Sequence, residues 1–245
     1  FKRVDAIVQK SGGNLHDPMR VQGAVLYGLE KARDSGGHLY LEAGALLKSA
    51  RLLLNEDVPI PAMQVTPQEL ESALEQMIRS NVLASNGGNI YLPYLFIQES
   101  ETACLVIQKL MEPVQPPENL PTVLEHIKGQ LGITLSERQH EGVLMAFRHN
   151  LSIITGGPGT GKSTILKAVI QAYRLLYPEG RIRLGAPTGK ASRRMAETTG
   201  VADAQTLHSL LGLHGDESVW QKKQKYLDAD LLIVDESSMI DMSLA

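Results

Sequence analysis

The octapeptide GGPGTGKS, at residues 156–163, combines the residue types that hold phosphate groups. It satisfies the pattern G-x-x-x-x-G-K-[ST], in which glycines turn backbone N–H groups toward phosphates, a lysine reaches the terminal phosphates and a hydroxyl faces Mg²⁺. A glycine turn that only joins a strand to a helix needs neither Lys162 nor Ser163 at fixed spacing. We therefore predict a nucleoside triphosphate site with Mg²⁺. The predicted nucleotide-binding residues here are Gly157, Pro158, Gly159, Thr160, Gly161, Lys162, Ser163 and Thr164.

Two adjacent carboxylates follow an apolar run near the end of the sequence. Leu231–Val234 has the character of a buried strand, which delivers Asp235 and Glu236 to its C-terminal end. Ligands of open α/β sheets bind at that edge. We predict that Asp235 and Ser163 hold Mg²⁺ and that Glu236 orients or deprotonates the attacking water, so that Lys162, Asp235 and Glu236 are catalytic. An Asp-Glu pair after a strand is often an ordinary loop, but the upstream phosphate loop favours catalysis.

A third segment, GAPTGKASRRMAE at residues 185–197, offers a hydroxyl, a glycine and a lysine. It has three residues between Gly185 and Gly189, one fewer than a phosphate loop requires. Thr188, Gly189 and Lys190 could instead bind a nucleic-acid backbone through hydroxyl and N–H groups. A helix cap followed by a solvated basic helix explains these residues equally well, so both interpretations stay open.

Hydrophobic periodicity predicts the elements that position these groups. Apolar strand-like runs at Leu151–Thr155, Ile182–Ala186 and Leu231–Val234 alternate with helical stretches at Gly161–Leu176 and Lys190–Glu197. Such alternation is typical of a parallel sheet with crossover helices. The second part of the chain is therefore predicted to be an α/β domain.

The first part of the chain has mainly helical periodicity. Its clearest helical runs are Val21–Arg33, Ala45–Leu54, Pro67–Arg79 and Ile97–Met111. The sequence TPQE, at residues 66–69, has a cap, a proline suited to the first turn and a glutamate that can reach back. Short β-prone runs around Asn86-Gly87-Gly88 predict a hairpin near residues 82–92. This order suggests a winged-helix-like module, and a helical domain whose hairpin only packs is equally compatible.

Four prolines between Glu112 and Pro121 interrupt any helix. We therefore predict a mainly helical module at residues 1–115 and an ATPase domain at residues 116–245. The net charge of −3 argues against coating of nucleic acid by bulk positive charge. Cys104 is the only cysteine, which excludes intrachain disulfides, and we expect it to be buried. Because no apolar run approaches the about 20 residues of a membrane span, we expect no membrane contact and a cytoplasmic location.

Five segments, in this order and spacing, resemble the Q motif and motifs I, Ia, Ib and II of superfamily 1 helicases, closest to the RecD/TraA branch. They are LSERQ, GGPGTGKST, APTGKASRRM, TLHSLLG and LLIVDESSM. This match is dense from Leu135 to Ala245. The opening FKRVDAIVQKSGG resembles the end of a helix-hairpin-helix region, and the elements that follow resemble the N-terminal region of stand-alone RecD-like helicases, which are also named exodeoxyribonuclease V alpha chains.

The resemblance implies a RecA-like P-loop ATPase that drives a DNA helicase, with 5′→3′ polarity, in DNA repair or recombination. ATP and Mg²⁺ would be its cofactors, and single-stranded and duplex DNA its partners. Gln139 would read the adenine base, although Ser136 and Gln139 also have capping-box spacing. Thr206 and His208 would lie near single-stranded DNA or couple it to the ATP site.

The resemblance further implies that later motifs, an arginine finger and a second RecA-like domain follow this sequence. We therefore expect a fragment that ends just after motif II, binds nucleotide weakly, cannot unwind DNA and is inactive alone. Two other classes stay open: a nucleotide-switched DNA-binding or assembly module, and part of a conjugative relaxase-helicase. Trp220 and the lysines of residues 214–230 could contact nucleic acid, but a solvated connection is favoured.

Overall fold

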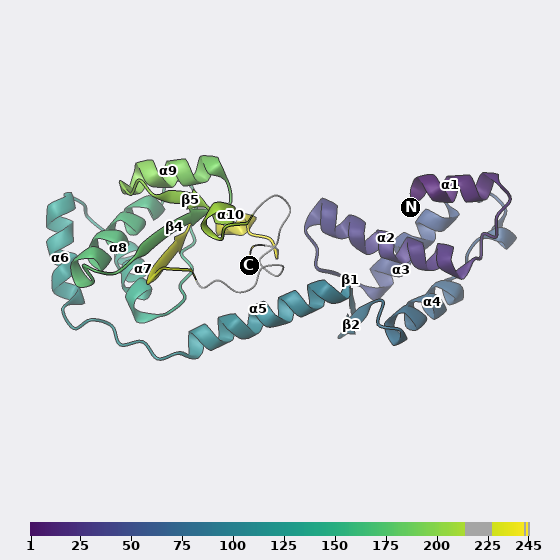
Figure 1. The fold of residues 1–245 in the computed structure, drawn as a ribbon, viewed down its shortest axis with the longest axis horizontal. Helices are drawn as coiled ribbons and strands as arrows, with labels where there is room; N and C mark the ends of the chain where they lie inside the picture. Colours follow the sequence, from purple (N-terminus) through teal and green to yellow (C-terminus); the bar gives the residue numbers. More distant parts are fainter. Residues whose placement is uncertain (214–226, 243, 245) are drawn as a thin grey trace. The chain divides into compact units, whose positions relative to one another are not determined.

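The computed structural model describes residues 1–213, 227–242 and 244, and its contacts divide the chain into two compact units (Figure 1). Unit 1 is Phe1–Ser100 and unit 2 is Glu101–Ala245. Helix α5 (Pro93–Met111) runs across this division. The domain boundary after residue 115 stays a prediction. Within the described part of the chain, no helix combines the length and the apolar character that crossing a membrane would require.

Unit 1 packs helices around one apolar core beside a small antiparallel sheet. Its helices are α1 (Lys2–Lys10), α2 (Pro18–Gly36), α3 (Ala43–Asn55), α4 (Pro67–Arg79) and the first part of α5, with a 3-10 turn η1 at Pro61–Met63. Its strands are β1 (Tyr40–Glu42), β2 (Ala84–Asn86) and β3 (Asn89–Tyr91), in the order β1-β3-β2. On α2 the buried residues Val21, Ala24, Val25 and Leu29 recur at three- and four-residue spacing, so one stripe of the helix faces the core.

Strands β2 and β3 form the hairpin, in which Ser85 pairs with Ile90. Gly87 and Gly88 join the strands with positive φ values of 57° and 87°. Glycine adopts such angles without a steric penalty, which explains the Gly-Gly pair at this turn. The structure thus places a hairpin after α4, and the winged-helix-like character of the unit stays a prediction.

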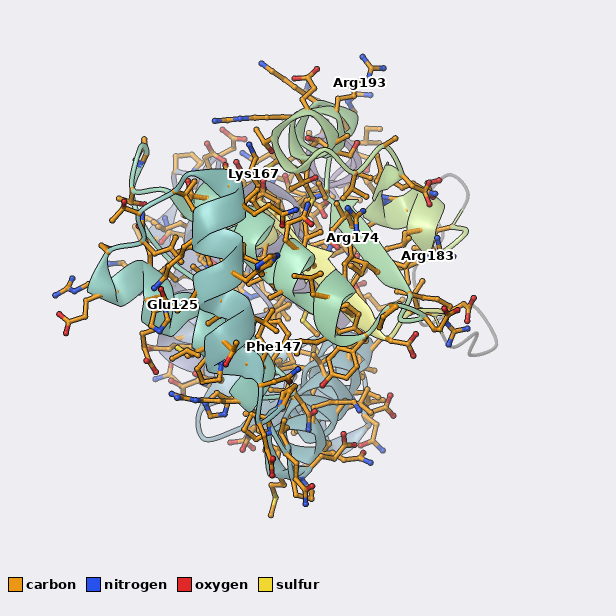
Figure 2. The ribbon with its side chains drawn as sticks, turned by 90° about the vertical axis from the view of Figure 1, so that its left-hand side faces the viewer. Glu125, Phe147, Lys167, Arg174, Arg183 and Arg193 are labelled. Atoms are coloured by element: carbon orange, nitrogen blue, oxygen red, sulfur yellow. The ribbon has the colours of Figure 1, made fainter. Side chains whose placement is uncertain are left out.

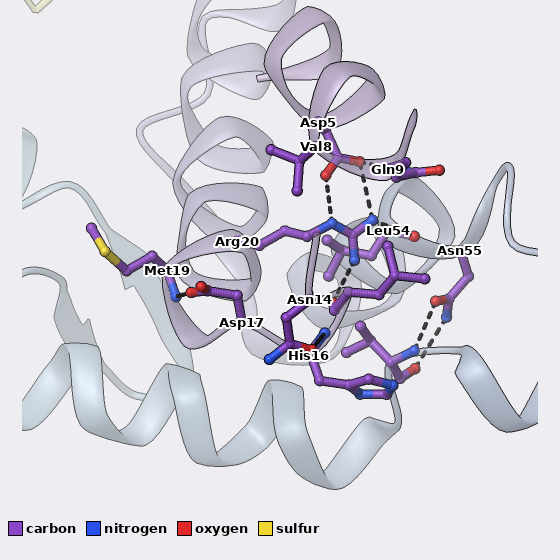
Figure 3. A network of polar contacts seen from close by, with 12 residues as sticks. Asp5, Val8, Gln9, Asn14, His16, Asp17, Met19, Arg20, Leu54 and Asn55 are labelled. Carbon is purple, nitrogen blue, oxygen red and sulfur yellow. Dashed lines mark hydrogen bonds and ion pairs between the residues drawn. The ribbon is translucent and has the colours of Figure 1, made fainter. Parts of the chain in front are cut away.

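A buried ion pair joins the first three helices of unit 1 (Figure 3). Arg20 is 8% exposed and donates two hydrogen bonds to the Asp5 carboxylate, of 2.5 and 3.0 Å. The same guanidinium donates to the carbonyl oxygens of Leu15 and Leu54, at 2.7 and 2.8 Å. Buried charges are tolerated when they are paired and hydrogen-bonded in this way. Arg20, on α2, therefore links this helix to α1 and to the end of α3 through hydrogen bonds.

Helix α4 begins with the capping box that the sequence predicts. The Thr66 N–H and hydroxyl both donate to Glu69 Oε2 at 2.8 Å, and His16 Nδ1 lies 2.7 Å from Oε1. Burial alone raises the pKa of Glu69, but these hydrogen bonds outweigh it, so that its pKa lies below the ordinary value. The cap is thus an acid-sensitive contact between α4 and the segment before α2.

We expect this contact to make unit 1 less stable in acid. A lowered folded-state pKa adds stability above the unfolded carboxyl pKa, about 4.3, and that stability is lost as the pH falls through the folded value. The thermal midpoint of Glu69→Gln should therefore depend less on pH between about 5 and 3 than that of the wild type. Glu71→Gln, on the same helix, is the control. Equal pH profiles for Glu69→Gln and the wild type would contradict the prediction.

Unit 2 is built on a parallel sheet in the order β5-β4-β6, as Figure 1 shows. The strands are β4 (Ile182–Ala186), β5 (Ala204–Thr206) and β6 (Leu231–Val234). The helices are α6 (Leu120–Leu131), α7 (Glu137–Arg148), α8 (Lys162–Leu176), α9 (Gly189–Thr199) and α10 (Leu207–Leu210), with a 3-10 turn η3 at Ser237–Met239. Helix α8 packs against α6, α7 and α9. The central β4 lies deepest, with Leu184 fully buried.

Two predictions about local structure are wrong. Leu151–Thr155 does not form a strand, and Ile153 is 71% exposed. A strand needs a hydrogen-bonded neighbour, and within the described residues β6 pairs with β4 alone, so that no ladder includes residues 151–155. Cys104 is exposed and not buried, because it lies on α5, of which only Leu95 is buried.

Candidate nucleotide-binding site

The phosphate loop connects residues 151–155 to the start of α8. Gly159 and Gly161 have φ values of 75° and 86°, a region that favours glycine. The Thr160 hydroxyl donates to the Gly157 carbonyl at 2.9 Å. A Cβ atom on Gly156 would lie 2.6 Å from that hydroxyl, so the loop has room only for glycine there. The loop is thus held in a tight turn by its own contacts and by backbone angles that its glycines permit.

Lys162 is the first residue of α8, and its ammonium group folds back over the loop. Its Nζ donates to the carbonyl oxygens of Gly156 at 2.5 Å and of Gly157 at 2.9 Å. Helix α8 has 15 residues, and its N-terminal N–H groups and dipole favour an anion beside Gly161 and Lys162. Ser163 follows with an exposed side chain. These groups form a cationic, donor-rich end suited to phosphates, and the Ser163 hydroxyl oxygen is a ligand type that Mg²⁺ accepts.

The Gln139 side chain takes part in the capping box of α7 and also contacts the phosphate loop. Its Oε1 accepts from the Ser136 N–H at 2.9 Å, which completes the capping box of α7. Its Nε2 donates to the Thr160 carbonyl at 3.0 Å. A Cβ atom on Gly161 would collide with this amide group. The capping glutamine therefore also contacts the phosphate loop, which places α7 against the site.

Gln139→Glu should separate these two contacts. The carboxylate can still accept from the Ser136 N–H, but it cannot donate to Thr160. Losing one hydrogen bond of about 1 kcal/mol should weaken ATP binding about fivefold, with the helix content unchanged. Titration of a fluorescent ATP analogue, with circular dichroism on the same samples, measures both quantities. Unchanged affinity would show that the contact with Thr160 does not support the loop.

The predicted carboxylates follow β6 directly. The Asp235 N–H donates to the Gly185 carbonyl at 3.0 Å, so β4 fixes the backbone at this point. Asp235 Oδ1 accepts from the Glu236 N–H at 2.9 Å. Glu236 has a φ of 54°, which is uncommon for a residue with a side chain and costs on the order of 1 kcal/mol or more. Such backbone conformations cluster at functional sites.

Metal binding here would depend on few protein ligands. Among the residues that the structure describes, no three His, Cys, Asp or Glu side chains gather closely enough to hold a metal ion. Mg²⁺ usually keeps several waters and takes one or two carboxylates plus substrate phosphates. A single aspartate and a hydroxyl are therefore a donor set that Mg²⁺ accepts together with a nucleotide.

The predicted DNA-contacting residues lie at two helix starts on the same sheet. Thr188 caps α9 by accepting from the Ala191 N–H at 3.2 Å, and Thr206 caps α10 by accepting from the Ser209 N–H at 3.2 Å. Gly189 and Lys190 open α9 and are exposed, and His208 lies in α10. The threonine hydroxyls therefore act as helix caps, while Gly189 and Lys190 remain exposed. Trp220 and its neighbouring lysines lie outside the described residues.

The close contact between Gly185 of β4 and Leu207 of α10 packs the start of α10 against the sheet. A Cβ atom on Gly185 would lie 2.7 Å from Leu207 Cδ2. Leu207 is buried. The glycine of β4 thus lets α10 pack close to the strand that carries the loop before α9.

Comparison with known proteins agrees with this geometry. Residues 139–245 match the family model of an AAA domain. The whole chain is 33% identical, over 257 aligned residues, to the ATP-dependent RecD2 DNA helicase of Deinococcus radiodurans and covers 34% of that protein. It is 34% identical over 128 residues to RecBCD enzyme subunit RecD of Mycobacterium tuberculosis, with 44% of this chain and 22% of that protein covered. A RecD subunit of Buchnera aphidicola is 28% identical over 190 residues, with 66% and 32% covered.

The parallel sheet, the phosphate loop and the AAA-domain match define a P-loop NTPase domain in the second half of the chain. Within that class, the chain is similar in sequence to RecD-type DNA helicases, as the order of its motifs predicts. It spans about a third or less of the length of these relatives.

Proposed function

We propose that this chain supplies the ATP-binding part of an ATP-dependent DNA helicase. The observation that carries the proposal is the phosphate loop at the start of α8, contacted by Gln139 through the Thr160 carbonyl. A loop that only joined two elements would need neither that contact nor the ammonium of Lys162 above it. The similarity to a RecD2 helicase along the whole chain supports DNA unwinding as the use of the hydrolysis energy.

Each site residue has a proposed role in this reaction. The loop N–H groups and Lys162 bind the phosphates, and Gln139 borders the loop where the base would be read. Ser163 and Asp235 hold Mg²⁺, which neutralises charge on the phosphate oxygens when it is bound. Glu236 orients the attacking water and accepts its proton. Thr164 lies in the first turn of α8, directly after Ser163, and is the last of the proposed nucleotide-binding residues.

The DNA side of the proposal rests on the two helix starts. Thr188, Gly189 and Lys190 contact phosphates of a single strand through N–H and ammonium groups at the start of α9. Thr206 and His208 lie beside that strand at the start of α10. Residues 1–115 act as a winged-helix or helix-hairpin-helix-like module that contacts duplex DNA. The motor acts with 5′→3′ polarity in repair or recombination.

Strand displacement by the native-length protein tests this function. Two otherwise identical duplexes carry either a 5′ or a 3′ single-stranded tail. We expect unwinding of the 5′-tailed duplex, and an at least about 100-fold loss of rate in Lys162→Ala because a preorganised cation no longer stabilises the phosphates. Unwinding of neither duplex, with ATP and DNA still bound, would favour a nucleotide-switched module. Unwinding of the 3′-tailed duplex alone would reverse the proposed polarity.

A further inference from the structure

Helices α8 and α9 concentrate positive charge. Together they contain six cationic side chains and one carboxylate, that of Glu197. The whole chain has a net charge of −3, so the rest of the sequence is acidic. Lys162 and Lys190 belong to the nucleotide and single-strand sites proposed above. Four cations remain without a role: Lys167, Arg174, Arg193 and Arg194.

These four side chains lie on the outer faces of two adjacent helices. All four residues are exposed. Lys167 and Arg174 are two helical turns apart on α8, opposite the buried Ile165 and Ala172. On α9, Arg193 lies opposite the buried Met195, whereas Arg194 lies about 100° around the helix from it. Helices α8 and α9 pack against each other, and Figure 2 labels Lys167, Arg174 and Arg193 on them.

Two other arginines of unit 2, Arg181 and Arg183, pair with aspartates. Arg181 pairs with Asp228 and Asp230, and its hydrogen bond to Asp230 raises the pKa of the arginine and lowers that of the aspartate. Arg183 pairs with Asp203 at 3.1 Å. In the part of the chain that the structure describes, none of the four cations on α8 and α9 forms an ion pair. The charge on α8 and α9 is therefore available to an external anion.

We propose that this α8–α9 surface, formed by Lys167, Arg174, Arg193 and Arg194, binds the phosphate backbone of duplex DNA. The proposal rests on the proposed helicase function and adds a second DNA contact to it. Packed helices lie about 8–10 Å apart, and Lys167 and Arg174 are separated by about 10 Å along α8. Two adjacent helices therefore carry the cations, at separations comparable with the groove, about 6 or 12 Å wide, between the two phosphate strands of a duplex.

The chemistry of the surface favours a duplex over a single strand. Proteins that bind single strands usually stack bases on aromatic side chains. Helix α9 contains no aromatic residue, and the one aromatic residue of α8, Tyr173, packs in a tilted arrangement against Tyr177, with ring centroids 4.9 Å apart. A surface of cations alone recognises phosphates without regard to sequence. A duplex presents those phosphates with its bases already stacked.

The salt dependence of duplex binding tests the proposal. The 245-residue chain is compared with the triple variant Lys167→Gln, Arg174→Gln, Arg193→Gln by fluorescence anisotropy on a blunt duplex of about 20 base pairs. Each lost phosphate contact lowers the slope of log affinity against log salt by about 0.9. We expect the slope to fall by about 2 to 3 and the affinity at low salt to fall at least about tenfold. Glutamine keeps the helix propensity of these exposed positions.

A matched triple variant controls for net charge at three unit 2 cations that are already paired with carboxylates: Lys128→Gln, Arg148→Gln, Arg181→Gln. Equal losses in both variants, or a wild-type slope in the α8–α9 variant, would overturn the proposal. A larger loss for a single strand than for the duplex would also overturn it. ATP binding is measured on the same samples. Retained ATP and duplex binding in the α8–α9 variant refutes only this inference, whereas a wild-type chain that binds no ATP refutes the proposed function.

Discussion

Replacing Glu236 by glutamine is expected to lower ATP hydrolysis by the native-length protein about 10²- to 10⁴-fold while ATP binding is retained. The amide has the shape of the carboxylate but cannot accept a proton from water. Glu236 follows Asp235 at the end of β6, and its left-handed backbone is set by the turn into η3, so the substitution leaves the loop in place. Steady-state hydrolysis with DNA present and titration of a fluorescent nucleotide measure the two effects.

Two further variants show whether the effect is specific to this carboxylate. Glu179→Gln removes an exposed carboxylate outside the site and should leave hydrolysis unchanged. Asp235→Asn should weaken the Mg²⁺ dependence of nucleotide binding, since it removes the proposed protein carboxylate of that ion. Hydrolysis at the wild-type rate by Glu236→Gln would refute its role as the base. Loss of ATP binding in the same variant would assign Glu236 to ground-state binding instead.

Helices and strands were predicted well from the sequence where residues close in sequence determine them. Helix α4 has the predicted bounds, Pro67–Arg79, because Thr66 and Glu69 fix its first turn through side-chain hydrogen bonds. The predicted strands Ile182–Ala186 and Leu231–Val234 also match β4 and β6. Leu151–Thr155 has the same apolar character but forms no ladder. Strand formation depends on a partner elsewhere in the chain, which an apolar run does not specify.

In the candidate site, too, features set by neighbouring residues were predictable and contacts between distant segments were not. Fixed spacing identified the phosphate loop, since glycine, lysine and hydroxyl positions are set by backbone geometry over eight residues. Spacing predicted that Gln139 could cap α7 but not that it would contact Thr160, because that contact joins residues 21 positions apart in the sequence. The positive φ of Glu236 was also not predictable, since glutamate has no preference for it. Lys167 and Arg174 were not singled out, although the lack of acidic residues in α8 was a visible signal.

Replacing Arg20 by methionine is expected to destabilise unit 1 by about 3–5 kcal/mol. The variant leaves the Asp5 carboxylate buried without its partner, and it removes the donors to the Leu15 and Leu54 carbonyls. Urea denaturation followed by circular dichroism measures the loss. Hydrogen exchange in peptides of α2 assigns the transition to unit 1.

The double variant Asp5→Leu, Arg20→Met distinguishes the cost of an unpaired charge from the value of the pair. Replacing both partners of a buried ion pair by apolar groups is often nearly neutral, so the double variant should be more stable than Arg20→Met alone. Arg79→Met is the control, because its pair with Glu75 is exposed on both sides and should contribute at most about 1 kcal/mol. If Arg20→Met cost no more than Arg79→Met, the ion pair would not be what joins α1 and α3 to α2. A double variant less stable than Arg20→Met would show instead that Asp5 stabilises the fold through its bond with Gln9, 2.9 Å long, independently of Arg20.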